Sequence, residues 1–327
     1  LAKVKIPLSD DSAAGIALAL GEAVVKFTHA YKKIRPDLVI IFADRYEMLA
    51  AAQAALIMQI PIAHVHGGDV TNGAFDDAIR HSITQMAQWH FPAHQGAVKT
   101  IRQLGEDSRN IFNVGALAMD AIRTLKLRSK LELEKTLDFS FQEKNLLITY
   151  HKETLSPLSG EEQARIFLKA LARKIFSHYG MIFTYPNADS EGKKIRKLID
   201  AFVKKHPHAR VYENLGQRNY FSAVHCVDAV VGNSSSGVLE VPFFAKPTVN
   251  IGNRQGGRFA PPSVIAVPLQ AEKIVRAIEK AIRMNRVGRS VKFKNPYGNG
   301  HAAERIVKIL GRQNIFGKAR AKRFCDL

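Results

Sequence analysis

Short apolar runs rich in β-branched residues alternate with longer amphipathic segments along most of the chain. The short runs predict strands, and the longer segments, with apolar residues three and four positions apart, predict helices. Strands that alternate with helices are typical of parallel sheets. The pattern therefore predicts an α/β fold with two doubly wound domains that face each other across a cleft.

The order of these segments divides the chain into two series. In the first series we expect strands at 38–43, 60–65 and 111–114, and helices at 13–34, 45–58, 76–89 and 96–104. A polar stretch rich in Lys and Glu, 126–144, predicts a connector. In the second series we expect strands at 146–150, 181–185, 210–212, 227–231, 248–251 and 264–267, and helices at 161–178, 192–205, 237–244, 271–284 and 302–310.

Composition adds a strong positive charge. The 327 residues include 48 Lys and Arg against 29 Asp and Glu, a formal net charge of +19. Such a surplus fits nucleic acid, an acidic membrane or an anionic small substrate. Much of the charge in the C-terminal part is spread over helical patterns, where a solvated face explains it. Because no interleaved aromatic residues or zinc-ligand spacing accompany it, we expect no nucleic-acid partner.

Cysteine content and hydropathy limit the class further. Two cysteines, Cys226 and Cys325, are too few for a disulfide framework, which predicts a cytoplasmic protein. The most apolar window, 48–65, includes Gln59 and His64, whose side chains are costly in a bilayer. We therefore expect neither a membrane-spanning segment nor a membrane partner.

Polar side chains follow the predicted strands of the first series. Ligands of parallel α/β sheets bind beyond the carboxyl ends of the strands. Asp44 and Arg45 follow the first strand, where they can address a sugar and a phosphate, although a helix cap explains Asp44 equally well. His66 and Asp69 follow the second strand, and Asp76 opens the next helix. Several titratable groups at one sheet edge can provide an acid and a base.

The string HVHGGD (64–69) also raises the question of a metal. His-x-His spacing suits zinc, but no third ligand stands at a recognisable spacing. We expect no metal and no other cofactor.

The second series carries groups suited to phosphate. His151 and Asn187 follow two of its strands, and the loop GNSSSG (232–237) joins a strand to a helix. Backbone N–H groups and the hydroxyls of Ser234 and Ser235 can hold a diphosphate there. The loop matches neither the Walker pattern nor the dinucleotide fingerprint.

Three further residues complete this group. Glu240 lies in the helix after the loop, where a carboxylate can accept both hydroxyls of a ribose. Arg254 and Arg258 stand in the glycine-rich turn GNRQGGR (252–258), and guanidinium groups suit phosphate oxygens. Asn187 is placed with these UDP-binding candidates.

At this point the chain resembles the hydrolysing UDP-N-acetylglucosamine 2-epimerases of the sialic and legionaminic acid branch. The matching strings are FADRYEMLAAAQAAL (42–56), IPIAHVHGGD (60–69), GAFDDAIRHSITQMAQWHF (73–91), FNVGALAMD (112–120), GNSSSGVLEVPFFAKPTVNIGNRQGGR (232–258) and YGNGHAAERIVKIL (297–310). The resemblance implies two Rossmann-like domains of glycosyltransferase-B type, with UDP in the cleft, in a homodimer or homotetramer. It implies an N-terminal domain over 1–130, joined by a C-terminal helix within 300–327, and a UDP-binding domain over 140–299.

The resemblance also implies a reaction. A base removes the proton on carbon 2 of the nucleotide sugar, UDP leaves, and water adds to the resulting glucal to release the 2-epimer. By position, Asp44 and Asp76 match the family's catalytic acids, and His151 matches a histidine from the second domain. Arg45 is expected near the diphosphate. The UDP-binding residues of the family match Ser234, Ser235, Glu240, Arg254 and Arg258.

Two departures from the family qualify these expectations. Many members have Glu where His66 stands, so His66 or Asp69 is expected to take its acid–base role, unless the substrate differs. Members also begin with a strand and a Gly-Thr-Arg-type turn, whereas this chain begins at Leu1, after that unit. We therefore expect the first domain to lack its N-terminal strand–helix unit and to expose an unpaired sheet edge, which would leave this chain inactive if the unit is truly missing.

The leading interpretation is a hydrolysing UDP-N-acetylglucosamine 2-epimerase that releases UDP and N-acetylmannosamine. The alternatives are a hydrolysing UDP-N,N'-diacetylbacillosamine 2-epimerase of legionaminic acid synthesis and a non-hydrolysing UDP-N-acetylglucosamine 2-epimerase. A glycosyltransferase of the same fold and a basic binding module without catalysis also remain open.

Overall fold

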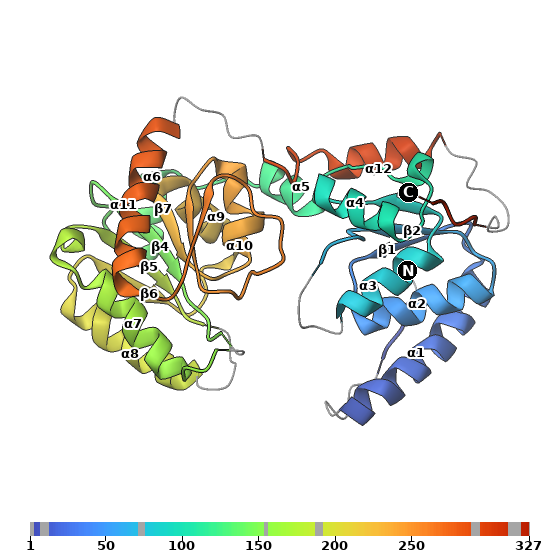
Figure 1. The fold of residues 1–327 in the computed structure, drawn as a ribbon, viewed down its shortest axis with the longest axis horizontal. Helices are drawn as coiled ribbons and strands as arrows, with labels where there is room; N and C mark the ends of the chain where they lie inside the picture. Colours follow the sequence, from blue (N-terminus) through green and yellow to red (C-terminus); the bar gives the residue numbers. More distant parts are fainter. Residues whose placement is uncertain are drawn as a thin grey trace. The chain divides into compact units, whose positions relative to one another are not determined.

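Two parallel sheets organise the protein, each in its own unit of the chain (Figure 1). The structure, a computed structural model, describes residues 3–6, 13–70, 76–153, 156–186, 192–288, 295–312 and 322–326. Unit 1 comprises 1–120 and 296–327, and unit 2 comprises 121–295. All strand pairs are parallel, which confirms the predicted α/β class.

Unit 1 has a three-stranded sheet in the order β1-β2-β3. Its strands are β1 (Val39–Phe42), β2 (Ile62–Val65) and β3 (Trp89–Phe91). Its helices are α1 (Ala13–Ile34), α2 (Tyr46–Ile57), α3 (Asp76–Met86), α4 (Gln95–Gln103), α5 (Leu117–Thr124, which runs on into unit 2) and α12 (Ala302–Leu310). Helix α2 packs between α1 and α3, and its buried alanines let the three helices approach closely.

Helix α12 brings the end of the chain into unit 1. The carboxylate of Asp120 accepts hydrogen bonds from the N–H groups of Ala302 and Ala303, at 3.0 and 2.9 Å, at the start of this helix. A carboxylate at a helix N-terminus satisfies donors that have no partner within the helix. On its apolar face, Ile306 and Leu310 are buried in a cluster with residues of β2 and β3.

A short tail segment, 322–326, is also held in unit 1. Nζ of Lys322 lies 2.5 Å from Oε1 of Glu106 and donates to the carbonyl of Gln85 at 2.7 Å. Oε2 of Glu106 lies 2.9 Å from Nε2 of His90, and both side chains are buried. Burial lowers the pKa of His90, so the neutral ring donates to the carboxylate. The buried charge of Glu106 thus depends on a lysine from the end of the chain.

Unit 2 has a six-stranded sheet in the order β6-β5-β4-β7-β8-β9. Its strands are β4 (Asn145–Thr149), β5 (Gly180–Thr184), β6 (Ala209–Tyr212), β7 (Ala229–Gly232), β8 (Thr248–Ile251) and β9 (Val264–Val267). Its helices are α6 (Lys130–Leu137), α7 (Gly160–Leu171), α8 (Gly192–Lys205), α9 (Gly216–Cys226), α10 (Ser236–Leu239) and α11 (Ala271–Gly288). This order is that of a doubly wound sheet, which reverses its winding between β4 and β7.

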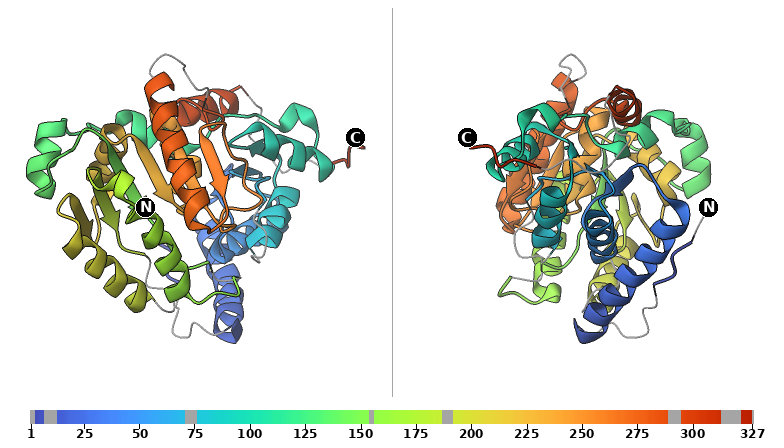
Figure 2. Two further views of the ribbon diagram at one scale, coloured as in Figure 1. Left: turned by 60° about the vertical axis from the view of Figure 1, so that its left-hand side comes forward. Right: turned by 90° about the vertical axis from the view of Figure 1, so that its right-hand side faces the viewer.

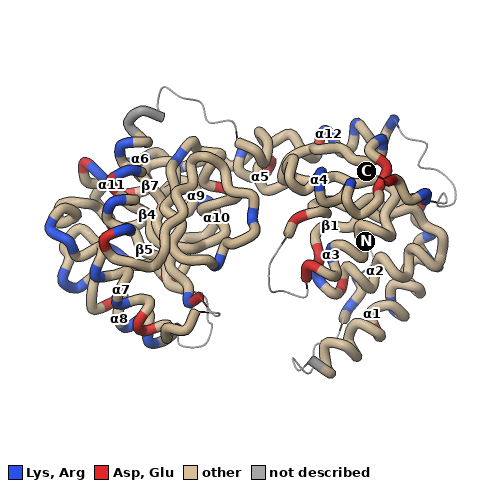
Figure 3. The backbone as a smooth tube through the Cα atoms, in the orientation of Figure 1, with Lys and Arg blue, Asp and Glu red and all other residues tan. Residues whose placement is uncertain are grey.

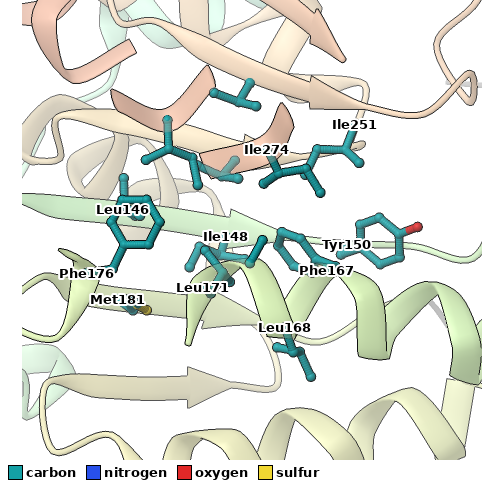
Figure 4. Packing of buried hydrophobic residues seen from close by; sticks show 14 of the residues in the cluster. Leu146, Ile148, Tyr150, Phe167, Leu168, Leu171, Phe176, Met181, Ile251 and Ile274 are labelled. Atoms are coloured by element: carbon teal, nitrogen blue, oxygen red, sulfur yellow. The ribbon is translucent and has the colours of Figure 1, made fainter. Parts of the chain in front are cut away.

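Helices cover both faces of this sheet (Figure 2). Side chains alternate along β4, so Leu146 and Ile148 pack with Phe167 of α7 and Ile274 of α11 (Figure 4). Leu147 points to the other face, among residues of α6 and α9. Burial of the sheet on both faces explains why its strands are continuous apolar runs.

Positive charge in unit 2 lies on solvated helix faces, and Lys and Arg are frequent along α8 and α11 (Figure 3). On α11, Lys273, Arg276 and Lys280 are exposed, whereas Ile274 and Ile278 are buried. No helix in the described residues is long and apolar enough to cross a membrane.

Several element predictions were wrong. The segment 111–114 is not a strand; Ile111 makes only an isolated bridge to His90. The third strand is β3, which the sequence pattern merged into a helix over 76–89 because three residues are too few to show alternation. Helix α9 was not predicted, and the stretch 126–144, predicted as a connector, contains α6 with a capping box from Ser129 and Glu132.

The division between units lies before 130. Residues 121–130, expected in the first domain, group with unit 2. Arg128 donates its backbone N–H to Ser222 at 2.9 Å and its Nε–H to Asn219 at 2.7 Å, and Arg218 donates to the carbonyl of Lys126 at 2.7 Å. These hydrogen bonds fasten this segment to α9.

The outer side of β1 pairs with no strand in the part of the chain that the structure describes. Ile40 and Phe42 on this strand are 54% and 50% exposed. Two large apolar side chains are therefore open to solvent on a sheet edge.

Candidate functional site

The two strands that carry the polar groups of unit 1 both end in left-handed backbone. Ala43 after β1 has a φ of 63°, and His66 after β2 has a φ of 64°. Non-glycine residues adopt this conformation at a cost, and such strain gathers at functional sites. Both turns lead the chain away from the sheet at its carboxyl edge, directly before Asp44 and Gly67.

A buried guanidinium, that of Arg80 on α3, connects the groups at this edge. It forms an ion pair with the carboxylate of Asp44, donates to Oδ1 of Asp77 at 2.7 Å and donates to the backbone carbonyl of Asp69 at 2.7 Å. The Arg80 side chain is 7% exposed, against 20% for Asp44 and 28% for Asp77. Arg80, which is itself held by Asp77 and by the backbone carbonyl of Asp69, thus fixes the position of Asp44.

His64 in β2 stabilises this edge through hydrogen bonds to the turn after β1 and to α3. Its Nε2–H donates to the carbonyl of Ala43 at 3.1 Å, and its Nδ1 lies 3.1 Å from the hydroxyl of Thr84. Burial lowers the pKa of His64 to about 3, so the ring is neutral. A Cβ on Gly67 would lie 2.7 Å from Nδ1 of His64, which explains why a glycine follows His66.

His66 and Asp69 each have a defined hydrogen-bond partner. Nε2 of His66 accepts the backbone N–H of Leu117 at 3.3 Å. The carboxylate of Asp69 accepts from Nε2 of His94, the N-cap residue of α4, whose Nδ1 accepts the N–H of Ala97 at 3.3 Å. Burial opposes the charge on Asp69, yet the hydrogen bond from His94 and the nearby charges hold its pKa below the usual range.

Two other predicted residues of unit 1 lie near this cluster. Arg45 is the residue before α2, and its largely exposed side chain bonds the carboxylate of Glu47 at 2.7 and 3.1 Å. Asp76 is the first residue of α3, next to Asp77.

In unit 2 the candidate residues gather where the sheet reverses its winding. Asn233 follows β7, and His151 follows β4. The side chain of Asn233 accepts the backbone N–H of His151 at 2.7 Å and donates to the backbone carbonyl of His151 at 2.8 Å. Gly232 has a φ of 143°, and a Cβ there would overlap the carbonyl of Thr149 at 1.8 Å. The ends of the two central strands are thus joined at the place where ligands of doubly wound sheets bind.

The serine loop follows directly. Ser234 and Ser235 are half-buried before α10, and the Ser235 side chain makes no capping hydrogen bond. Glu240, at the end of α10, is half-buried.

The turn after β8 is attached to the same point. Arg254 and Gln255 donate to the carbonyl of Asn233, at 3.2 and 2.9 Å. Arg258 is half-buried in this turn, where its backbone N–H donates to the carbonyl of Gln255 at 3.3 Å. Asn187 lies outside the described residues.

Three residues of these edges were given no role from sequence. Arg80 could have been noticed because it stands three positions after Asp77, on the same helix face. His94 follows a strand that was not predicted. Asn233 lies in the loop 232–237, but its role depends on a contact 82 residues away. Among the described residues, no cluster of three His, Cys, Asp or Glu could hold a metal.

Comparison with known proteins gives a consistent result. The family model described as UDP-N-acetylglucosamine 2-epimerase matches residues 1–311. The chain is 38% identical to the GDP/UDP-N,N'-diacetylbacillosamine 2-epimerase (hydrolyzing) of Campylobacter jejuni, over 80% of this chain and 68% of that protein. It is 30% identical to the UDP-N,N'-diacetylbacillosamine 2-epimerase (hydrolyzing) of Legionella pneumophila, over 94% of this chain and 79% of that protein.

Among solved structures, the fold is similar to that of the UDP-GlcNAc 2-epimerase from Neisseria meningitidis bound to UDP-GlcNAc. The TM-score is 0.76 at 17% identity, over 95% of this chain and 84% of that one. This likeness confirms the predicted fold class of glycosyltransferase-B type.

Proposed function

The chain belongs to the UDP-N-acetylglucosamine 2-epimerase family, and we propose that it is a hydrolysing member that releases UDP and a free 2-epimer from a UDP-2-acetamido sugar. The observation that carries this proposal is the content of the two sheet edges. The edge of the unit 1 sheet carries histidines and carboxylates, one of which forms an ion pair with the buried Arg80. The edge of the unit 2 sheet carries hydroxyls and guanidinium groups at the point where the doubly wound sheet reverses its winding.

Unit 2 supplies the groups for UDP. Ser234 and Ser235 offer hydroxyls and backbone N–H groups to the diphosphate, and Arg254 and Arg258 offer positive charge. As UDP departs it keeps the electron pair of the broken bond, and fixed donors stabilise that charge. Glu240 accepts the ribose hydroxyls. Asn187 is retained as a UDP-binding candidate on sequence grounds.

Unit 1 supplies the acid–base groups. Asp44 removes the proton on carbon 2, and the electron pair of that bond becomes the second bond between carbons 1 and 2 as UDP leaves. Asp76 and His66 are further catalytic groups of the same reaction. Arg45 lies near the diphosphate. Unit 2 contributes His151. Water then bonds to carbon 1 and a proton returns to carbon 2. No step needs a metal or a nicotinamide.

Of the two substrates expected from the sequence, the relatives favour UDP-N,N'-diacetylbacillosamine. The two hydrolysing relatives named for that sugar are 38% and 30% identical to this chain. UDP-N-acetylglucosamine, which would yield N-acetylmannosamine, is the second candidate. We place the enzyme in the cytoplasm as a homodimer or homotetramer, in sialic or legionaminic acid synthesis.

The test is to incubate the protein with each UDP-sugar and measure UDP and free reducing sugar. Equal amounts of UDP and a manno-configured sugar support the proposal. UDP without that sugar would count against it. Deuterium incorporation at carbon 2 without free UDP would indicate the non-hydrolysing reaction, and transfer to an added acceptor would indicate a glycosyltransferase.

Replacing Asp44 tests its role as a base. We expect Asp44→Asn to lower kcat/KM by on the order of a hundredfold, because the amide cannot take the proton. The matched control is Asp37→Asn, since Asp37 is an exposed residue before β1. Unchanged turnover of Asp44→Asn would refute the assignment.

A further inference from the structure

The hydrogen bonds at the unit 1 edge distinguish two neighbouring candidates for the second acid–base group. Inversion at carbon 2 requires that a proton leave from one face and another arrive at the opposite face, so one carboxylate is not enough. Asp44 serves one face in the proposed function. His66 and Asp69, both on the loop after β2, are the candidates for the other.

The imidazole of His66 is held in one tautomer. Its Nε2 accepts the N–H of Leu117 at 3.3 Å, so in the neutral ring the hydrogen is on Nδ1. Burial lowers the pKa of His66, although Asp69 and Asp44 oppose this, so the ring stays neutral. A neutral ring with Nε2 engaged offers an N–H donor and no lone pair for a substrate proton.

The carboxylate of Asp69, unlike the His66 ring, has lone pairs that can take up a proton. His94 accepts the N–H of Ala97 on Nδ1, so its Nε2 carries the hydrogen that Asp69 receives. The His94 side chain is 6% exposed and packs edge-on against Tyr297, with ring centroids 5.2 Å apart, whereas Asp69 is 34% exposed. A rigid donor therefore orients one carboxylate oxygen while the group remains open to a ligand.

Asp69 and Asp44 are also tied to the same cation. Arg80 donates to the backbone carbonyl of Asp69 at 2.7 Å and forms an ion pair with Asp44. The charged and titratable groups that face Asp69 are His94 at the start of α4, His66 on its own loop and Arg80 on α3.

We infer that Asp69 is the second acid–base group of the reaction, that His94 is its positioning residue, and that His66 acts as a hydrogen-bond donor through Nδ1. This inference rests on the proposed function. After the elimination Asp44 passes the proton from carbon 2 to solvent, and the carboxylate of Asp69 takes a proton from solvent. In the hydration step Asp69 gives that proton to carbon 2, water bonds to carbon 1, and the proton that water loses passes to the carboxylate of Asp44. Before the next elimination Asp44 releases this proton to solvent and is again a carboxylate.

Kinetics of three variants test the roles. We expect Asp69→Asn to lower kcat for formation of the free 2-epimer on the order of a hundredfold, and His66→Asn to lower it by about tenfold or less. Asn retains a donor near the position of Nδ1 and tolerates the left-handed backbone of residue 66. A hundredfold loss in His66→Asn with normal turnover in Asp69→Asn would overturn the inference.

The pH profile of a His94 variant distinguishes a positioning role of His94 from a purely structural one. His94→Asn keeps an N-cap for α4 but is too short to replace the imidazole that bonds Asp69. Without that donor, burial raises the pKa of Asp69, and because Asp69 acts as an acid we expect the alkaline limb of the kcat profile for free-sugar formation to move to higher pH. A uniform loss of activity with no movement of the limb would show that His94 is only structural.

The closing experiment determines the tautomers of His66 and His94 without an activity assay. In protein labelled with ¹⁵N-histidine, with His66→Asn and His94→Asn used to assign signals, we expect His66 protonated at Nδ1 and His94 at Nε2. UDP release together with His66 protonated at Nε2 would refute the inference and leave the proposed function standing. The expected tautomers without UDP release from either sugar would refute the proposed function instead.

Discussion

Arg80 shows how much depends on a single buried side chain. Its guanidinium is the shared partner of Asp44, Asp77 and the carbonyl of Asp69. We expect Arg80→Met to lower the free energy of unfolding by about 2 to 4 kcal/mol, because two partly buried carboxylates lose their cation. Urea unfolding measures this. Arg109→Met, which removes an exposed ion pair with Asp107, is the control and should leave the midpoint unchanged.

His64 makes stability depend on pH. The unfolded chain titrates this ring near 6.5, whereas burial lowers the pKa to about 3 in the folded protein. Between these values the unfolded chain binds a proton that the folded chain excludes, so the stability is complete above pH 6.5 and falls toward pH 3.

We expect the urea midpoint of the wild type to fall more steeply between pH 7.5 and 5.5 than that of His64→Gln, which has no proton to bind. His29→Gln, at an exposed position on α1, should keep the wild-type slope. Equal slopes in all three proteins would show that His64 does not carry this dependence.

At the scale of single residues, sequence indicated the chemistry but not the connections. Asp44, His66 and Asp69 were singled out because polar residues follow strands. Arg80 and Asn233 escaped because their roles consist of contacts with residues far away in sequence. Such contacts exist only once the sheet has brought the strand ends together.

At the scale of elements, long periodic segments were predicted well and short ones were not. Helices α1 and α8 match their predicted bounds because many residues repeat the same pattern. Strand β3 has three residues, and its identity depends on pairing with β2. Helix α9 begins at Gly216. The polar residues of its first turn interrupt the sequence pattern of the apolar face that packs on β4.

The serine loop is the element on which UDP affinity should depend. We expect the double change Ser234→Ala with Ser235→Ala to weaken UDP binding by about tenfold or more, since two hydroxyl donors to a charged group are lost. The unfolding midpoint should stay close to that of the wild type, because Ser235 caps no helix in this structure. Wild-type affinity by calorimetry would contradict the assignment of this loop to the diphosphate.

At the scale of the whole molecule, the last described residues stabilise unit 1. We expect Lys322→Met to lower the free energy of unfolding by about 1 to 3 kcal/mol and the melting temperature by a few degrees, because Glu106 is left buried with a neutral histidine. The control is Arg323→Met, at the exposed neighbouring position. Equal melting of the two variants would show that the Lys322 contact contributes nothing.

The placement of α12 in unit 1 has a consequence for biosynthesis. Residues 39–91, which carry β1 to β3, are translated before unit 2, whereas Ile306 and Leu310, which complete the apolar cluster around Val65 and Phe91, are translated after it. Unit 2, continuous from 121 to 295, has its entire sheet available before then. The sheet of unit 1 is therefore translated before unit 2 but closes its core after it, and until α12 is translated it exposes surface that chaperones recognise.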